Sequence, residues 1–239
     1  MARSCGIHID DRKPSGALGG HEQSKLYPPY LPHGLFTVGI QEIVDKNATI
    51  DLLDNIGRCH QSLGEYSHAV SAHEKVLKRR DRTIGLTQEA TLDTMNKLGL
   101  VLHSLGDYVK AERIHRRTLI LNKEVLGPQH PLTLTSQANL ASTYRNQGRW
   151  KEAEELNVQV METSSRVLGP ENPSTLASQA NLAATLKDQN CLERAIQLMV
   201  PCVELSSKVL GPEHHLTSVR LHTLALWQQS RKIASSRTV

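Results

Sequence analysis

Few residues of this sequence have the type and spacing that metal or redox chemistry requires. The chain has twelve His, but the only adjacent pair is His214-His215, and no Cys or carboxylate stands near that pair at convincing ligand spacing. The four Cys, at positions 5, 59, 191 and 202, form no CxxC motif. We therefore predict no metal site, no zinc finger and no disulfide scaffold.

The motifs of common enzyme classes are also absent. The sequence contains no GxxxxGK[ST] loop that would cradle a phosphate, no HExxH and no GxSxG. The Gly-rich stretch at 15–20 follows no predicted strand, so its composition indicates a flexible linker. The sequence predicts a protein that is not an enzyme, with no catalytic residues and no cofactor.

Composition limits the kind of core and the kind of partner. Apolar residues make up 38% of the 239 residues and aromatic residues only 3%, so the core must consist of Leu, Ala, Val and Ile. No apolar run approaches the roughly 18 residues of a membrane span. The first sixteen residues lack the apolar stretch of a secretory signal. We expect a cytoplasmic protein with reduced cysteines and no membrane partner.

The densest basic run is Lys78-Arg79-Arg80-Asp81-Arg82. It could be an import signal or a nucleic-acid patch, but cations also complement the dipole at the end of a helix, and we favour that interpretation. The net charge is only +4, and charge is not concentrated along the chain. A nucleic-acid binder usually shows a basic stripe, so we predict no nucleic-acid partner.

A repeat of 42 residues organises the chain. Residues 126–167 and 168–209 align without gaps and are identical at half of their positions. The same phase continues in both directions, which is the signature of a repeat architecture. It defines the units 42–83, 84–125, 126–167 and 168–209 and a partial capping unit at 210–239. Residues 1–41 fall outside the repeat, and we predict that this segment, rich in Pro and Gly, is mostly disordered.

Each unit has the pattern of two helices. In the unit 126–167, Gly127-Pro128 and Pro131 interrupt structure, and Thr133 or Thr135 is expected to cap a helix that runs to about residue 147. Gly148 would end this helix in the left-handed conformation. A second helix would run from Trp150 to about residue 167, and its predicted stripe consists of Trp150, Ala153, Leu156, Val160, Thr163 and Val167. Neither helix can bury its stripe alone, so the units must stack into an all-α solenoid.

These residues resemble the tetratricopeptide repeat (TPR) family. Leu140-Ala141, Tyr144, Gly148, Trp150 and Ala153 follow the family pattern in order, and the two preceding units match it at Leu98-Gly99 and Ile56-Gly57. The usual period is about 34 residues. The 42-residue period and the linker LGPxHPxTL are similar to the kinesin light chain-like arrays of fungi. The resemblance covers about 42–239 and implies a right-handed superhelix of antiparallel helix-turn-helix units.

The last units depart from this pattern at three places. Asn190-Cys191-Leu192 replaces Gly148-Arg149-Trp150, which predicts a less regular turn. Pro201 falls inside a second helix, where we expect a kink or an early stop. In the partial unit, Leu221, Leu224 and Ala225 could belong to one helix that caps the array.

The resemblance places the first helices on the concave side of the array, and the repeat phase then identifies the side chains that face this groove. Asn55, Asn139 and Asn181 share one phase, with Lys97 at that position in the second unit. In TPR proteins Asn at this position clasps the backbone of a ligand, and an amide offers a donor and an acceptor. Basic side chains in the groove would hold acidic groups or a terminal carboxylate. The candidate partner-binding residues are Asn55, Arg58, Lys97, Asn139, Arg145, Asn181 and Lys187. The structural alternative is that each Asn bonds only the neighbouring helix.

We predict a non-catalytic scaffold that binds a peptide or protein segment in the concave groove. The alternative is a detached ligand-sensing arm of an NTPase-type signalling protein of the NACHT or NB-ARC kind, which would act only when joined to such a domain. Attachment to a microtubule motor is discounted, since residues 1–41 contain no heptads for a coiled coil. The partner and the oligomeric state stay open.

Overall fold

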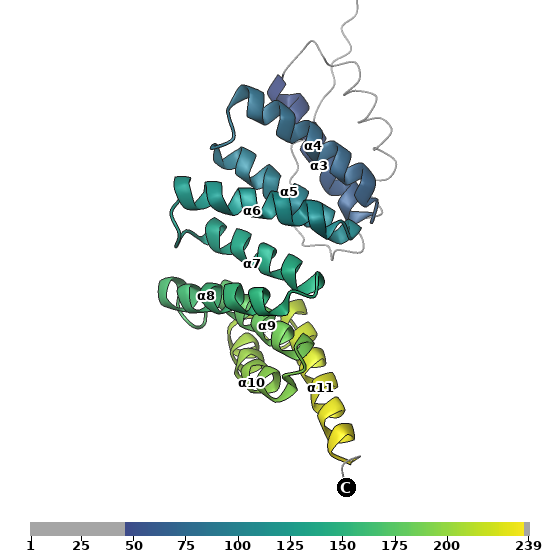
Figure 1. Ribbon diagram of the computed structural model, residues 1–239, viewed down its shortest axis with the longest axis vertical. Coiled ribbons are helices and arrows are strands. Elements are labelled where there is room, and N and C mark those ends of the chain that lie inside the picture. Colours follow the sequence, from purple (N-terminus) through teal and green to yellow (C-terminus); the bar gives the residue numbers. More distant parts are fainter. Residues whose placement is uncertain (1–45, 237–239) are drawn as a thin grey trace, which may run out of the picture.

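The computed structural model describes residues 46–236, and this part of the chain consists of nine α-helices with no strand. Each helix packs against the next, in a single stack from α3 to α11 (Figure 1). The predicted all-α solenoid is therefore confirmed, whereas the segment 1–41 lies outside the described residues. The helices, labelled as in Figure 1, are α3 (Lys46–Ser62), α4 (Tyr66–Thr83), α5 (Glu89–Leu105), α6 (Tyr108–Val125), α7 (Pro131–Asn146), α8 (Trp150–Leu168), α9 (Pro173–Asp188), α10 (Leu192–Val209) and α11 (His215–Ser236).

Each unit supplies a first helix and a second helix. The odd-numbered helices are the first helices and the even-numbered ones from α4 to α10 are the second helices. Besides the contacts between consecutive helices, α5 touches α7 and α7 touches α9. First helices of neighbouring units thus lie side by side. Within 46–236, no helix combines the length and apolar character needed to cross a membrane.

One repeated hydrogen bond closes the linker before a first helix. A buried Thr hydroxyl donates to the carbonyl oxygen of a linker glycine six residues earlier, at 2.8 Å in each of three pairs: Thr91 with Gly85, Thr133 with Gly127, and Thr175 with Gly169. These glycines have φ values of 88°, 90° and 91°, the region that glycine favours. The expected capping role of Thr133 or Thr135 is wrong, because His130 is the N-cap of α7 and Pro131 follows it.

The turn between α9 and α10 keeps the backbone of the preceding units, contrary to the prediction. Asn190 has a φ of 64°, near the 76° of Gly148. Its N–H donates to the carbonyl oxygen of Lys187, and the next N–H donates to Leu186, as in the turn at Gly148. Asn tolerates the left-handed conformation better than most residues with a side chain, so it substitutes for glycine here.

Helix α10 runs through Pro201 to Val209, so the predicted early stop is wrong. Pro201 lies on the exposed face, and Gln197, whose carbonyl loses its helical donor, is exposed as well. Water can satisfy that carbonyl, which limits the cost of the missing bond. The opposite face stays buried through Met199 and Cys202.

A glycine facing a histidine sets the close approach of the two helices in the first two units. His73 and His115 are fully buried on α4 and α6. A Cβ added at Gly57 or Gly99 would lie 2.8 Å or 2.4 Å from the Cε1 atom of the facing ring, too close for any packed core. The same positions in the next two units hold buried pairs with other volumes: Ala141 with Asn157, and Ala183 with Met199.

In the units 126–167 and 168–209, a glutamine that follows the first helix forms hydrogen bonds with the preceding unit. The side-chain amide of Gln147 donates to the carbonyl oxygen of Tyr108 at 3.1 Å and to Glu112 at 2.9 Å. One repeat later, Gln189 donates to the carbonyl oxygen of Trp150 at 3.0 Å and to Glu154 at 2.8 Å. These bonds fix α7 against α6 and α9 against α8.

The apolar stripe of α8 differs from the prediction at both of its ends. Trp150 is 40% exposed and Val167 is 42% exposed, whereas Ala153, Asn157, Val160 and Ser164 are buried. The carbonyl of Trp150 receives the inter-unit bond while its ring stays at the surface. The buried stripe therefore includes Asn157 and Ser164. Because these two residues are polar, a search for apolar periodicity does not find them.

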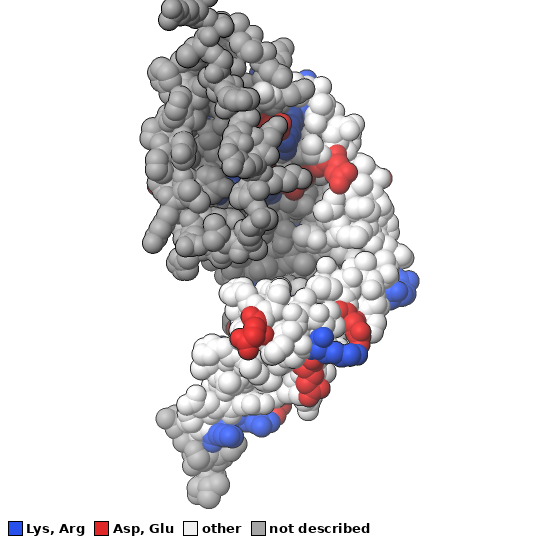
Figure 2. All heavy atoms as spheres, turned by 180° about the vertical axis from the view of Figure 1, so that it is seen from behind, with Lys and Arg blue, Asp and Glu red and all other residues white. Residues whose placement is uncertain are grey.

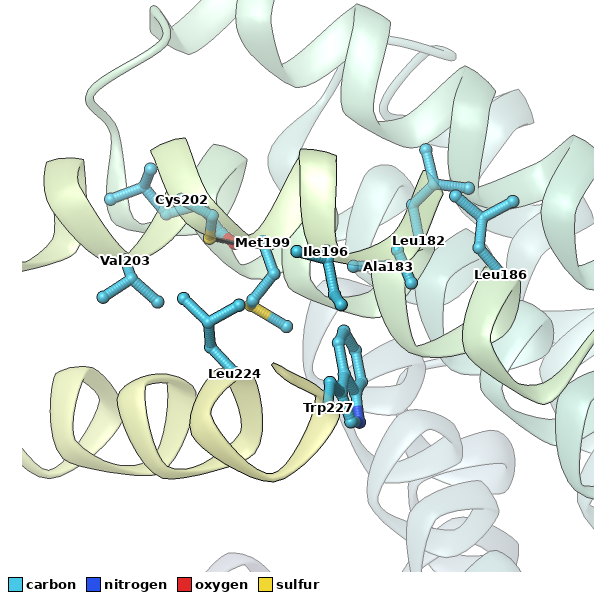
Figure 3. Packing of buried hydrophobic residues seen from close by; sticks show 11 residues of the cluster. Leu182, Ala183, Leu186, Ile196, Met199, Cys202, Val203, Leu224 and Trp227 are labelled. Atoms are coloured by element: carbon cyan, nitrogen blue, oxygen red, sulfur yellow. Dashed lines mark hydrogen bonds between the residues drawn. The ribbon is translucent and has the colours of Figure 1, made fainter. Parts of the chain in front are cut away.

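The last helix, α11, covers the end of the array through Leu224 and Trp227. Both side chains point toward Ile196 and Met199 of α10 (Figure 3). In the same cluster the Cys202 thiol donates to the carbonyl oxygen of Leu176 at 3.2 Å. The expected capping helix is present, but Leu221 and Ala225 are exposed rather than packed, because α11 meets α10 along another face.

The pairing of glycine with histidine gives a stability prediction. Gly99→Ala should destabilise the chain by about 1–3 kcal/mol through overpacking, although the same change in a helix interior ordinarily stabilises. Adding His115→Asn should restore most of this loss, since it copies the Ala141–Asn157 pair. In that unit Asn157 donates to Thr185 at 3.0 Å, and Thr143 stands at the equivalent position. Urea unfolding of the two variants tests this, and equal destabilisation would contradict it.

Burial of His115 predicts a loss of stability in weak acid. Burial and the nearby His103 lower the pKa of His115 from 6.5 to about 4. The neutral imidazole is the folded form, so the unfolded chain takes up a proton first as the pH falls below 6.5. The free energy of unfolding that the neutral His115 contributes is complete above pH 6.5, and it decreases by up to about 3 kcal/mol toward pH 4. Unfolding free energies at pH 7.5 and 5 should differ less in Gly99→Ala/His115→Asn than in the wild type, and an unchanged difference would refute the assignment.

Candidate functional site

A pocket of about 240 Å³ opens between the first helices α7 and α9. Both helices supply its walls, and the C-terminal half of α8 supplies its floor. The repeat explains this arrangement, because two neighbouring first helices flank the second helix that connects them. The lining residues are Pro131, Leu134, Thr135, Ala138 and Asn139 of α7, Val160, Ser164 and Leu168 of α8, and Ser174, Ala177, Ser178 and Asn181 of α9.

The structure brings two of the predicted residues, Asn139 and Asn181, into this one pocket. Their backbone carbonyls are occupied, since Thr143 and Thr185 hydroxyls donate to them at 2.9 Å and 3.0 Å. The Nδ2 donor of Asn139 is buried and makes no hydrogen bond with the described residues. A buried donor without an acceptor costs free energy, so an acceptor that entered the pocket would recover it. The Asn181 side chain is exposed beside it.

Lys97 stands in a different environment from the two amides. Its ammonium lies 2.7 Å from an oxygen of Asp54 and 2.8 Å from one of Asp93. Although burial opposes ionisation, the His73 ring 3.5 Å away and the hydrogen bond from Lys97 hold the pKa of Asp54 well below its usual range. Burial likewise opposes the charge on Lys97, but its bonds to both carboxylates raise the pKa of this ammonium. Lys97 joins α5 to α3, and its predicted ligand contact stays a prediction.

The remaining predicted residues lie at the ends of these helices or in the first unit. Arg145 Nε is 3.5 Å from a carboxylate oxygen of Asp188, and the exposed Lys187 ammonium is 3.7 Å from the other oxygen. These two cations share one carboxylate, which leaves one positive charge at that end of the groove. Arg58 donates to the side chain of Asn55, and both are exposed on α3.

Among residues 46–236, none of those that line the pocket is charged. Figure 2 shows one face of the molecule, on which acidic and basic side chains of the described residues are scattered over a mostly uncharged surface. The pocket itself offers apolar contacts from Leu134, Val160 and Leu168, together with hydroxyl and amide groups. It therefore suits an uncharged polypeptide segment better than a highly charged ligand.

Sequence reasoning missed the floor of the pocket and part of its rim. The repeat phase of the first helix identifies Thr135, Ala138 and Ala177 as groove-facing, but Val160 and Ser164 come from α8 and belong to another periodicity. A signal existed in the small residues, because Ala and Ser at facing positions leave space between α7 and α9. An analysis of one helix at a time does not show that the small residues of α7 face those of α9.

Comparisons with known proteins agree with this architecture. Models of the tetratricopeptide repeat match residues 49–88, 90–163 and 138–199. A search of curated proteins found no sequence that matches the chain.

Three similar solved structures illustrate the fold. A point variant of a putative kinesin light chain with nearly identical TPR-like repeats from Podospora anserina is 23% identical, with a TM-score of 0.67 over 79% of this chain and 93% of that one. BtubC (BKLC) from P. vanneervenii is 14% identical, with a TM-score of 0.64 over 92% and 88%. A Rap protein complexed with Competence and Sporulation Factor is 10% identical, with a TM-score of 0.61 over 87% of this chain and 62% of that one.

The family matches span more than half of the chain and coincide with the helix pairs α3 to α10. The linker glycines, the closing threonines and the left-handed turns recur in phase with these pairs. The chain belongs to the tetratricopeptide repeat family.

Proposed function

We propose that this chain is a non-catalytic interaction array that binds an extended segment of a partner protein in the pocket between α7 and α9. Stacked helical repeats present extended concave surfaces that suit such binding. The observation that supports the proposal is the unpaired, buried Nδ2 of Asn139 in a pocket that also holds Asn181.

The two amides suit the backbone of a bound segment. Each Asn offers a donor and an acceptor, and the two residues are one repeat apart on adjacent helices. An extended peptide exposes carbonyl and N–H groups at regular intervals, so a segment crossing α7 and α9 meets both amides. The apolar floor, including Val160 and Leu168, then receives one uncharged side chain.

The basic residues in the last turns of α7 and α9 make one end of the groove positively charged. Arg145 and Lys187 carry two positive charges against the single carboxylate of Asp188. An acidic side chain or a terminal carboxylate of the partner would complete this charge balance. We place Asn55, Arg58 and Lys97 outside the principal contact, because they lie on α3 and α5 and do not line the pocket between α7 and α9.

The alternative function, a detached ligand-sensing arm of an NTPase-type signalling protein, stays a prediction, and no feature of residues 46–236 favours it over the scaffold. The Rap protein with similar architecture was solved in complex with Competence and Sporulation Factor. That complex is a precedent for ligand binding by the fold.

The proposal predicts that Asn139→Ala/Asn181→Ala loses its partner. The purified chain would be used to isolate proteins from native cell extract, with mass spectrometry as the readout, and affinities would follow with the partner segment as a peptide. Two lost hydrogen bonds of about 1–1.5 kcal/mol each should weaken binding about 30–150-fold. A second variant, Ala177→Leu, fills the pocket and should have the same effect without removing an amide.

The matched control is Glu155→Ala/Gln197→Ala, which truncates two exposed side chains on the second helices α8 and α10. It should retain every partner of the wild type. Circular dichroism must show equal helicity in all variants before they are compared. Retention of all partners by both pocket variants would exclude this pocket as the binding site.

A further inference from the structure

Three potential metal ligands gather at the turn between α3 and α4. His60 lies in the last turn of α3, Glu65 is the N-cap of α4, and His68 lies in its first turn. One ligand atom of each side chain lies within 4.8 Å of the others. His60 Nδ1 is 2.5 Å from Glu65 Oε2, and the two imidazole rings stack with centroids 5.1 Å apart.

Packing does not explain a histidine at position 60. The repeat phase places Leu102, Tyr144 and Leu186 there in the next three units, and all three are buried core residues. His60 is also buried, at 7% exposure, although an imidazole fills such a site less well than Leu. The first unit thus gives up apolar packing at a position that the other units keep apolar.

Helix capping does not explain Glu65 either. At the equivalent position Asp107 accepts a hydrogen bond from the backbone N–H of Lys110, and its carboxylate pairs with the Lys110 ammonium at 2.8 Å. Glu65 makes no such capping bond. Its carboxylate turns toward His60 instead, and His68 replaces the basic or acidic residue that pairs with the N-cap in the next two units.

We propose that His60, Glu65 and His68 bind a divalent transition-metal ion, with Zn²⁺ as the best match. Two imidazole nitrogens and one carboxylate oxygen are ligands that Zn²⁺ prefers, whereas Ca²⁺ and Mg²⁺ prefer all-oxygen sites. Bonds of about 2.1 Å in a tetrahedron separate the ligand atoms by about 3.4 Å. The exposed side chains of Glu65 and His68 can reach this spacing by rotation, because only His60 is fixed by burial.

The ion would join the end of α3 to the start of α4, with water at the fourth position. It would brace the turn of the first unit. Glutamines of the following unit bond the corresponding turns of the second and third units, whereas the second unit has Leu105 at that position. The sequence prediction of no metal site rested on the adjacent pair His214-His215 and on the spacing of the four Cys. The three ligands here are separated by four and two residues and meet only when the two helices fold back on each other.

The test is a Zn²⁺ titration of the chain without any histidine tag, followed by calorimetry and by thermal unfolding. The wild type should bind one Zn²⁺ per chain in the micromolar range or tighter, and its unfolding temperature should rise with added Zn²⁺. His60→Leu/His68→Ala should bind at least tenfold more weakly and lose that rise. His60→Leu copies the residue of the second and fourth units, so the core is preserved.

His68→Ala alone provides a variant that leaves the core untouched, because His68 is exposed. It should also weaken Zn²⁺ binding at least tenfold. His222→Ala, which removes an exposed histidine on α11, should bind as the wild type does. Absence of Zn²⁺ binding by the wild type, or equal binding by His68→Ala, would overturn the proposal and leave the His60–Glu65 contact as an ordinary hydrogen bond that closes the turn.

Discussion

The close approach of the two helices within each unit is the constraint on which the rest of the structure depends. Aromatic residues are scarce, so the units bury their stripes by bringing backbones together at small residues. Gly57 and Gly99 leave room for a whole imidazole, whereas Ala141 and Ala183 face smaller or more flexible side chains. A small residue recurs at this position in all four units, while the side chain that faces it varies in size to fill the remaining space.

Polar contacts then set the spacing between units, and this spacing creates the pocket. The amides of Gln147 and Gln189 hold α7 and α9 against the preceding second helices. Asn157 of α8 donates to Thr185 of α9, which anchors the floor to one wall. With these bonds in place, Ala138 and Ala177 are too small to fill the space between α7 and α9. The pocket is thus a consequence of ordinary repeat packing combined with small groove residues.

The repeat phase made much of the fold predictable, because a 42-residue period assigns every residue to a face of its helix. It predicted the helix pairs, the left-handed Gly148 and a final helix that packs through Leu224. Its predictions were wrong at positions where an unexpected residue type keeps the same backbone conformation as in the other units. Asn190 adopts the conformation of a glycine, and Pro201 lies on the solvent side of a helix that continues past it.

The candidate site was predictable only in part, since phase identifies the face of a side chain but not its partner. Asn139 and Asn181 share the pocket, but Lys97 at the same phase pairs with Asp54 of the neighbouring helix. The pocket as a whole and the His60–Glu65–His68 group each combine residues of different helices. The most direct test of peptide binding places a photo-crosslinking amino acid at Thr135, on the pocket wall, and separately at Glu155 on α8. Our account predicts that the partner is crosslinked from Thr135 and not from Glu155, and crosslinking from Glu155 alone would contradict it.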